Sequence, residues 1–166
     1  MNRIARLSLL SIIFTGCASS SGSYKVNQPL SQPLTYDKIG LKVTMAAGIS
    51  DKFSLMTEDA FIDVLDDNTF KSVAKGNASQ VLNVKIVSLN EGDDTKWALN
   101  MGGNADVTME VEIISNGKKI GQLNVTGTSD TRVRSNVNQY GKSAALNAIH
   151  AAAKQLEAYF ASTRGP

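Results

Sequence analysis

The sequence predicts an α+β domain in which a mainly antiparallel sheet of four to five strands carries two helices on one face. Three observations support this fold class. Several short runs alternate apolar and polar residues, two longer segments have one apolar helical face, and the strand-like runs follow one another closely in the chain. Such strands commonly pair antiparallel, and a one-faced helix needs an apolar surface to cover. A single domain is expected over residues 37–162.

The first residues are typical of an exported protein. Arg3 and Arg6 precede an apolar run at 7–14, which is far shorter than the about 20 residues that a membrane-spanning helix needs. Small residues follow, and Cys17 stands where a bacterial lipobox has its lipidated cysteine. Residues 1–16 therefore resemble a lipoprotein signal peptide. The other interpretation is an ordinary signal peptide that contains a cysteine.

Lipidation also accounts for an isolated thiol. Cys17 is the only cysteine in the sequence, so it has no intramolecular disulfide partner in an oxidising compartment. Fatty acyl chains such as palmitate on this residue would anchor the chain to a membrane. In the lipoproteins that this segment resembles, an aspartate after the cysteine commonly retains the protein at the inner membrane. Ala18 occupies that position, which favours the periplasmic face of the outer membrane.

The charge of the chain changes when the signal peptide is removed. The full sequence has 17 lysines and arginines against 15 acidic residues, and two of the arginines lie in residues 1–16. The remaining chain is formally neutral, so its composition offers no support for binding nucleic acid.

Residues 17–36 are predicted to be a lipidated cysteine followed by a flexible tether. The segment is rich in serine at 19–23 and contains Pro29 and Pro33, and it has no periodic apolar face. We expect it to be mobile or irregular and to hold the domain clear of the lipid headgroups.

The elements of the domain follow from hydrophobic periodicity. Alternation predicts strands, and apolar residues at helical spacing predict an amphipathic helix with an acidic side and a final alanine-rich helix. The strands are expected at 39–45, 70–73, 81–89, 107–114 and 118–128, and the helices at 54–67 and 139–160.

Asn116-Gly117 between two alternating runs predicts a hairpin. A two-residue loop would place Leu123 opposite a glutamate and mix the two faces of the sheet. A three-residue loop over 115–117 pairs Leu123 with Met109 and keeps the apolar residues together. We therefore expect the longer loop, with Gly117 in the left-handed conformation of a bulge.

Several of these motifs resemble a family of small bacterial lipoproteins catalogued as a domain of unknown function. The resemblance covers roughly residues 37–161 and implies a layout similar to periplasmic accessory domains of outer-membrane export and peptidoglycan-synthesis machinery. It implies no catalytic residues. The motifs are Val81-Leu82-Asn83-Val84, Met101-Gly102-Gly103-Asn104-Ala105, Asn116-Gly117, Gly127 and Gly141-Lys142-Ser143.

No catalytic, cofactor or metal site is predicted. His150, the only histidine, falls on the polar side of the last helix. Gly141-Lys142-Ser143 lacks the rest of a phosphate-binding loop and is interpreted as a helix start. The acidic turn at Asp93-Asp94 does not have the spacing of a calcium loop.

The most suggestive segment for binding is the irregular stretch around Trp97. This residue is either a plug over the open end of the core or an anchor for a partner, together with Met101, Gly102 and Gly103. The sequence thus favours a lipid-anchored, periplasm-facing binding or assembly module that contacts another envelope protein and catalyses nothing. The alternative is an envelope hydrolase that uses unrecognised carboxylates. Buried titratable groups in a cleft would favour the hydrolase, and a shallow surface with an open strand edge would favour the binding module.

Overall fold

A computed structural model describes residues 19–92, 104–130 and 140–164 of the protein. Within these ranges the sequence folds into strands and helices in the order β1 (Ser19–Gln28), β2 (Lys38–Met45), α1 (Lys52–Leu65), β3 (Ser72–Lys75), β4 (Gln80–Asn90), β5 (Asn104–Ser115), β6 (Lys118–Asp130) and α3 (Tyr140–Thr163).

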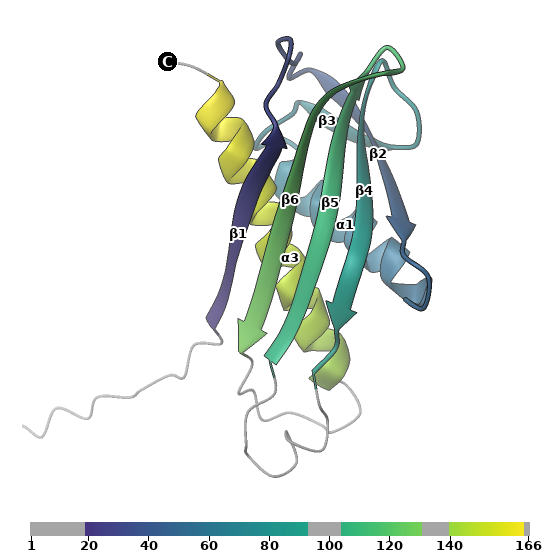
Figure 1. The fold of residues 1–166 in the computed structure, drawn as a ribbon, viewed down its shortest axis with the longest axis vertical. Helices are drawn as coiled ribbons and strands as arrows, with labels where there is room; N and C mark the ends of the chain where they lie inside the picture. The colour runs from purple at the N-terminus through teal and green to yellow at the C-terminus, as the bar shows by residue number, and fades with distance from the viewer. Residues whose placement is uncertain (1–18, 93–103, 131–139, 165–166) are drawn as a thin grey trace, which may run out of the picture.

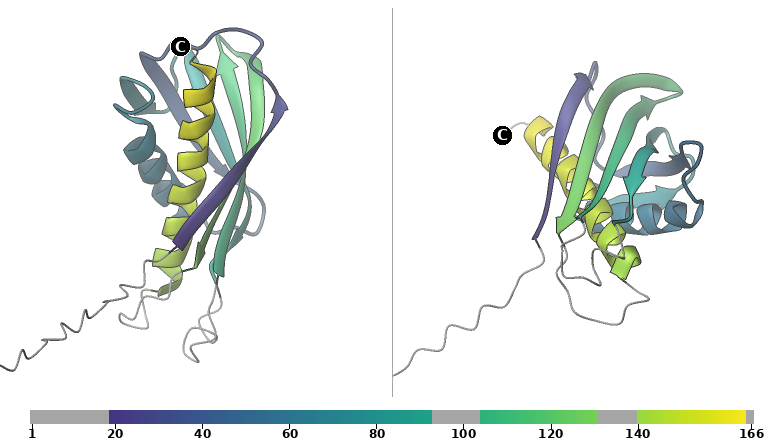
Figure 2. Two further views of the ribbon diagram at one scale, coloured as in Figure 1. Left: turned by 90° about the vertical axis from the view of Figure 1, so that its left-hand side faces the viewer. Right: turned by 60° about the horizontal axis from the view of Figure 1, so that its bottom comes forward.

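The strands form one sheet with the spatial order β1-β6-β5-β4-β2-β3 (Figure 1). β2 runs parallel to both β3 and β4, and the other neighbouring strands are antiparallel. Both helices pack on one face, α3 against β1, β6 and β5, and α1 against β2 and β3 beside α3 (Figure 2). The predicted fold class is confirmed. The sheet has six strands where four to five were expected.

The two helices lie close to their predicted positions. α1 begins two residues earlier than expected, and α3 extends three residues beyond the expected end. Gly141, Lys142 and Ser143 lie in the first turn of α3, which confirms their interpretation as a helix start. No helix in the described ranges is long and apolar enough to cross a membrane.

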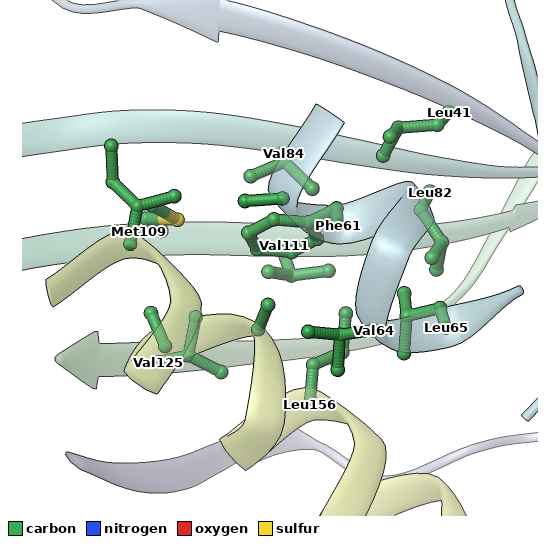
Figure 3. Close-up of a cluster of buried hydrophobic side chains, with 14 of the residues drawn as sticks. Leu41, Phe61, Val64, Leu65, Leu82, Val84, Met109, Val111, Val125 and Leu156 are labelled. Carbon is green, nitrogen blue, oxygen red and sulfur yellow. The ribbon is translucent and has the colours of Figure 1, made fainter. Parts of the chain in front are cut away.

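One apolar core lies between the sheet and the helices. Phe61 of α1 is fully buried, as are Leu82 of β4 and Met109 of β5. Leu156 of α3 reaches the same cluster from the second helix (Figure 3). The residues labelled there come from β2, β4, β5, β6 and both helices: Leu41, Phe61, Val64, Leu65, Leu82, Val84, Met109, Val111, Val125 and Leu156. Because these side chains all point to one face, the opposite face of the sheet has no covering layer among the described residues.

The prediction of a flexible tether over 17–36 is wrong for Ser19–Gln28. These residues form β1, which pairs antiparallel with β6 at one edge of the sheet. Only one side of this edge strand meets α3. On that side Tyr24 contacts Tyr159 of α3, with ring centroids 5.7 Å apart. Residues 29–37 are irregular, as expected.

The hairpin between β5 and β6 also differs from the prediction. Ser115 pairs with Lys118, so the loop has two residues, and Asn116 and Gly117 both have positive φ, at 50° and 78°. This is the geometry of a type I′ turn. The faces are kept in phase by a bulge near Ile120, after which Leu123 pairs with Val111 and not with Met109. The expectation that Leu123 lies on the buried face is met, but a bulge inside the strand achieves it.

Two glycines let α3 approach the sheet closely. Gly22 of β1 pairs with Gly127 of β6 beneath the alanine-rich part of α3. A Cβ atom on Gly127 would lie 1.9 Å from the carbonyl oxygen of Ala148. One on Gly22 would lie 2.5 Å from the carbonyl oxygen of Thr126 in β6 and 3.2 Å from that of Ala151 in α3. Glycine within a strand commonly marks such a close approach of two backbones. The crossing point of α3 therefore depends on the absence of a side chain at this pair.

Gly127→Ala should destabilise the domain by about 3 kcal/mol, because the added methyl group forces the helix backbone away from the sheet. The measurement is urea denaturation of a soluble form that begins at Ala18. Gly117→Ala is the matched control, since an added Cβ there meets no atom within 4 Å. This control should lower the free energy of unfolding by only about 1–2 kcal/mol, which is the strain of a Cβ atom in the left-handed conformation. Equal midpoints for the two variants would contradict the close approach.

Phe160→Ala should destabilise the same soluble form by about 3–5 kcal/mol, because this ring of α3 is fully buried and packs against Phe70, with ring centroids 5.2 Å apart. His150→Ala should stay within about ±0.5 kcal/mol, since its side chain lies at the surface of α3. Thermal unfolding followed by circular dichroism separates the two. Similar losses for both variants would mean that α3 does not face the core as described.

Candidate functional site

The surface that could bind a partner is the sheet face opposite the helices, called here the open face. In every long strand, the residues that alternate with the core residues point to this side. Serines, threonines, asparagines, lysines and glutamates predominate among them. The open-face residues that pair across β1, β6, β5, β4 and β2 include Ser21, Ser23, Lys25, Thr126, Thr128, Asn124, Thr108, Glu110, Glu112, Asn83, Lys85, Lys42 and Thr44.

Hydroxyl groups tie β1 to β6 on the open face. The side-chain oxygens of Ser21 and Thr128 are 2.8 Å apart, and those of Ser23 and Thr126 are 2.9 Å apart. Asn27 also donates a hydrogen bond to the side chain of Asn124, at 2.9 Å. Cross-strand pairs of this kind each stabilise a sheet by a few tenths of a kcal/mol to about 1 kcal/mol. The serines that suggested a linker in the sequence are thus sheet residues.

The open face is hollowed over β2, β4 and β5. The hollow has a volume of about 420 Å³ and is about half open to solvent. All of its lining side chains are polar or charged: Lys42, Thr44, Asn83, Lys85, Glu110 and Glu112. The strand register brings them together, because Lys42 pairs with Asn83 and Thr44 with Lys85, while Asn83 pairs in turn with Glu112 and Lys85 with Glu110.

Residues of β6 hold the two glutamates of the hollow. Gln122 donates a hydrogen bond from its side-chain nitrogen to Glu110. The ammonium group of Lys119 lies 3.2 Å from a carboxylate oxygen of Glu112 and donates a second bond to Gln122 at 3.0 Å. The carboxylates of Glu110 and Glu112 are thereby turned toward the β6 side of the hollow.

The lysines on the other side of the hollow have no such partner in the described ranges. Lys85 lies directly opposite Glu110 in the ladder, yet no carboxylate of the described residues lies within ion-pair distance of Lys85 or Lys42. The hollow therefore presents two ammonium groups on β2 and β4 beside two carboxylates on β5. Because Lys119 and Gln122 already engage the carboxylates, the arrangement suits a surface that brings acidic groups to the two lysines.

The acidic side of α1 is another surface that could meet a basic partner. In the structure, Lys75 of β3 lies 3.1 Å from both Asp59 and Glu58, and hydrogen bonds to Asp59 and then Glu58 raise its pKa. Asp66 is the C-cap residue of α1, and its carboxylate accepts a hydrogen bond from the backbone N–H of Val73, at 2.7 Å. The charge of this side is partly neutralised by the protein itself, which favours the solvated helix face over a docking surface.

The edge of the sheet at β1 is a further open feature. β1 stands last in the strand order, so the described strands pair with only one of its two sides. Tyr24 and Val26 are each 38% exposed there. Burial raises the pKa of the neighbouring Tyr159, with the rings of Tyr36 and Tyr24 adding to the effect. An edge of this length is a site where a strand of another chain can pair.

The structure offers little support for the hydrolase alternative. Among the side chains that the structure describes, no aspartate, glutamate, lysine or histidine is buried, and no group of them is arranged to hold a metal ion. His150 lies 4.0 Å from Asp63, but on the helix side of the molecule and away from the hollow. A half-open polar hollow beside an open strand edge is more typical of a binding module than of a catalytic cleft.

Five residues predicted to function from the sequence lie outside the described ranges: Cys17, Trp97, Met101, Gly102 and Gly103. Their roles in lipidation and partner contact stay predictions, and Asp93-Asp94 lies outside as well. The hollow was not predicted from the sequence. Its signal was present as polar residues that alternate with the core residues of three strands, but only the register shows that those residues meet.

Comparison with known proteins identifies the fold. No protein-family model matches the sequence, and no curated protein matches it either. Among solved structures, a Xanthomonas campestris protein assigned to the family model DUF330 has a TM-score of 0.57 at 11% identity. That match covers 87% of this chain and 96% of the other. The predicted resemblance to a domain of unknown function is confirmed at the level of the fold.

Two further structures are similar. The PelC dodecamer from Paraburkholderia phytofirmans has a TM-score of 0.50 at 18% identity, over 82% of this chain and 95% of that chain. A minor lipoprotein from Acinetobacter baumannii has a TM-score of 0.45 at 16% identity, over 81% and 97% of the two chains. Because the sequence identities are low, the similarity to PelC shows a shared fold only. Nothing is concluded from the similarity to the Acinetobacter baumannii lipoprotein.

Proposed function

We propose that this protein is a lipid-anchored binding or assembly module of the bacterial cell envelope, facing the periplasm and catalysing no reaction. The anchor is Cys17, which follows a signal-like segment of 16 residues. The observation that carries the binding role is the one-sided sheet. Its helices cover one face, and the other face presents a hollow with two lysines and two glutamates.

The partner fitted by this hollow is a protein surface with acidic groups opposite Lys42 and Lys85, since Lys119 and Gln122 already bind Glu112 and Glu110. Such complementarity fixes orientation and partner choice more than it adds affinity. PelC of P. phytofirmans forms a dodecamer, so assembly into larger structures is compatible with this fold. We place the protein at the outer membrane, because Ala18 and not aspartate follows the cysteine.

Cys17→Ser should release the protein from membranes, because the hydroxyl group cannot form the thioether that carries the lipid. Fractionation of cells and the intact mass of the purified protein are the measurements. The unsubstituted protein should be heavier than its mature sequence by the mass of a diacylglyceryl group and an added acyl chain. Recovery of the serine variant in the membrane fraction would contradict the anchor.

A photo-crosslinking residue at Thr44, on the rim of the hollow, should capture an envelope protein in intact cells. The matched control carries the same group at Asp63, which is exposed on α1 on the opposite side of the sheet. Lys42→Glu should reduce capture from position 44, because it reverses one charge of the hollow. Equal capture from positions 44 and 63 would contradict a role for the open face.

A further inference from the structure

The start of β1 limits how far the domain can lie from its lipid. The strand begins at Ser19, and only Ala18 separates this residue from Cys17 in the sequence. Two residues of fully extended chain span at most about 7 Å. The tether expected from the sequence would have given the domain many times that reach. With the proposed lipid on Cys17, the first residue of the sheet is held close to the headgroups.

The strand register shows which end of the domain this is. Ser19 pairs with Asp130, the last residue of β6, and Asp130 pairs in turn with Asn104, the first residue of β5. Asn90, the last residue of β4, pairs with Asp106 beside them. All four strands thus have an end here, at the bottom of Figure 1, which we call the anchor end. The Asn116-Gly117 turn and the last turn of α3 lie at the top.

The sides of the domain carry no apolar patch among the described residues that would hold it flat on the membrane. The four exposed large apolar residues of the described ranges are scattered over three elements: Tyr24 and Val26 on β1, Leu55 on α1 and Val87 on β4. The open face carries hydrated charges. The edge of β1 has unpaired backbone groups, which lose hydrogen bonds when they enter hydrocarbon. A domain held by one end through a short link, with polar sides, extends away from the surface.

We infer that the domain stands upright on the membrane, with the anchor end against the phospholipid headgroups and the Asn116-Gly117 turn farthest from them. This inference rests on the proposed lipidation of Cys17. The described side chains at the anchor end suit a hydrated headgroup layer. Lys52 and Glu91 form an ion pair of 3.2 Å, and Asn90 donates a hydrogen bond of 3.0 Å to Asp106.

The orientation decides which partners can reach the hollow. Glu110 and Glu112 lie six and eight residues along β5 from Asn104, which at about 3.3 Å per residue places them roughly 20–26 Å above the anchor end. The open face and the edge of β1 both point sideways, parallel to the membrane. The partner class is therefore a protein that stands on, or projects from, the same membrane beside this domain.

The test uses full-length lipidated protein in vesicles of phosphatidylethanolamine and phosphatidylglycerol that contain a headgroup-attached nitroxide quencher. Since the lipid occupies Cys17, an introduced cysteine is the sole thiol for a fluorescent label. Asn104→Cys places the label at the anchor end, and Lys118→Cys places it on the exposed residue after the turn. The quencher acts at short range, so the first label should lose its fluorescence and the second should keep it.

A linker insertion serves as the matched control. Twelve glycine and serine residues between Ala18 and Ser19 add a coil of roughly 17–21 Å, so quenching of the Asn104→Cys label should fall. Unchanged quenching with the linker, equal quenching of both labels, or stronger quenching at Lys118→Cys would each refute the upright orientation while leaving the anchor intact. Thiol labelling of the unsubstituted protein would instead show a free Cys17, which refutes the anchor and with it the orientation.

Discussion

The contact between α3 and the paired glycines of β1 and β6 is the constraint on which the rest of the structure depends. With no side chain at Gly22 or Gly127, the backbone of α3 comes within van der Waals distance of the sheet. Alanines on the helix fill what space remains, and larger residues of α3, such as Ile149 and Phe160, reach into the core. All apolar burial is thereby gathered on one face of the sheet.

This one-sided packing also explains β1. A strand of serines, glycine and polar residues has too little apolar surface to fold against a helix alone. It is held because β6 supplies backbone partners, because the hydroxyl pairs with Thr126 and Thr128 align it, and because Gly22 admits α3. The result is an N-terminal edge strand that begins two residues after the proposed lipid, so folding of the sheet and placement on the membrane are coupled.

The open face owes its chemistry to the same arrangement. A sheet face without helices must be compatible with water, so its strands alternate apolar and polar residues. Where the twisted strands β2, β4 and β5 meet, the polar residues form a hollow in which β6 holds the carboxylates apart from the lysines. A surface of this kind can discriminate between protein partners. Among the described side chains, the aspartates, glutamates, lysines and His150 all remain at least partly exposed.

The sequence by itself determined the fold class, both helices, five of the six strands and the isolated cysteine, because periodicity and composition are local properties. It could not determine that Ser19–Gln28 is a strand, since the evidence for it lies about 100 residues away in β6. It also could not place the bulge near Ile120, because a two-residue turn and a three-residue turn are both compatible with alternation when a strand can absorb one residue. The hollow could not be predicted from the sequence either. Lys42, Asn83 and Glu112 lie on three separate strands, and only the tertiary register brings them side by side.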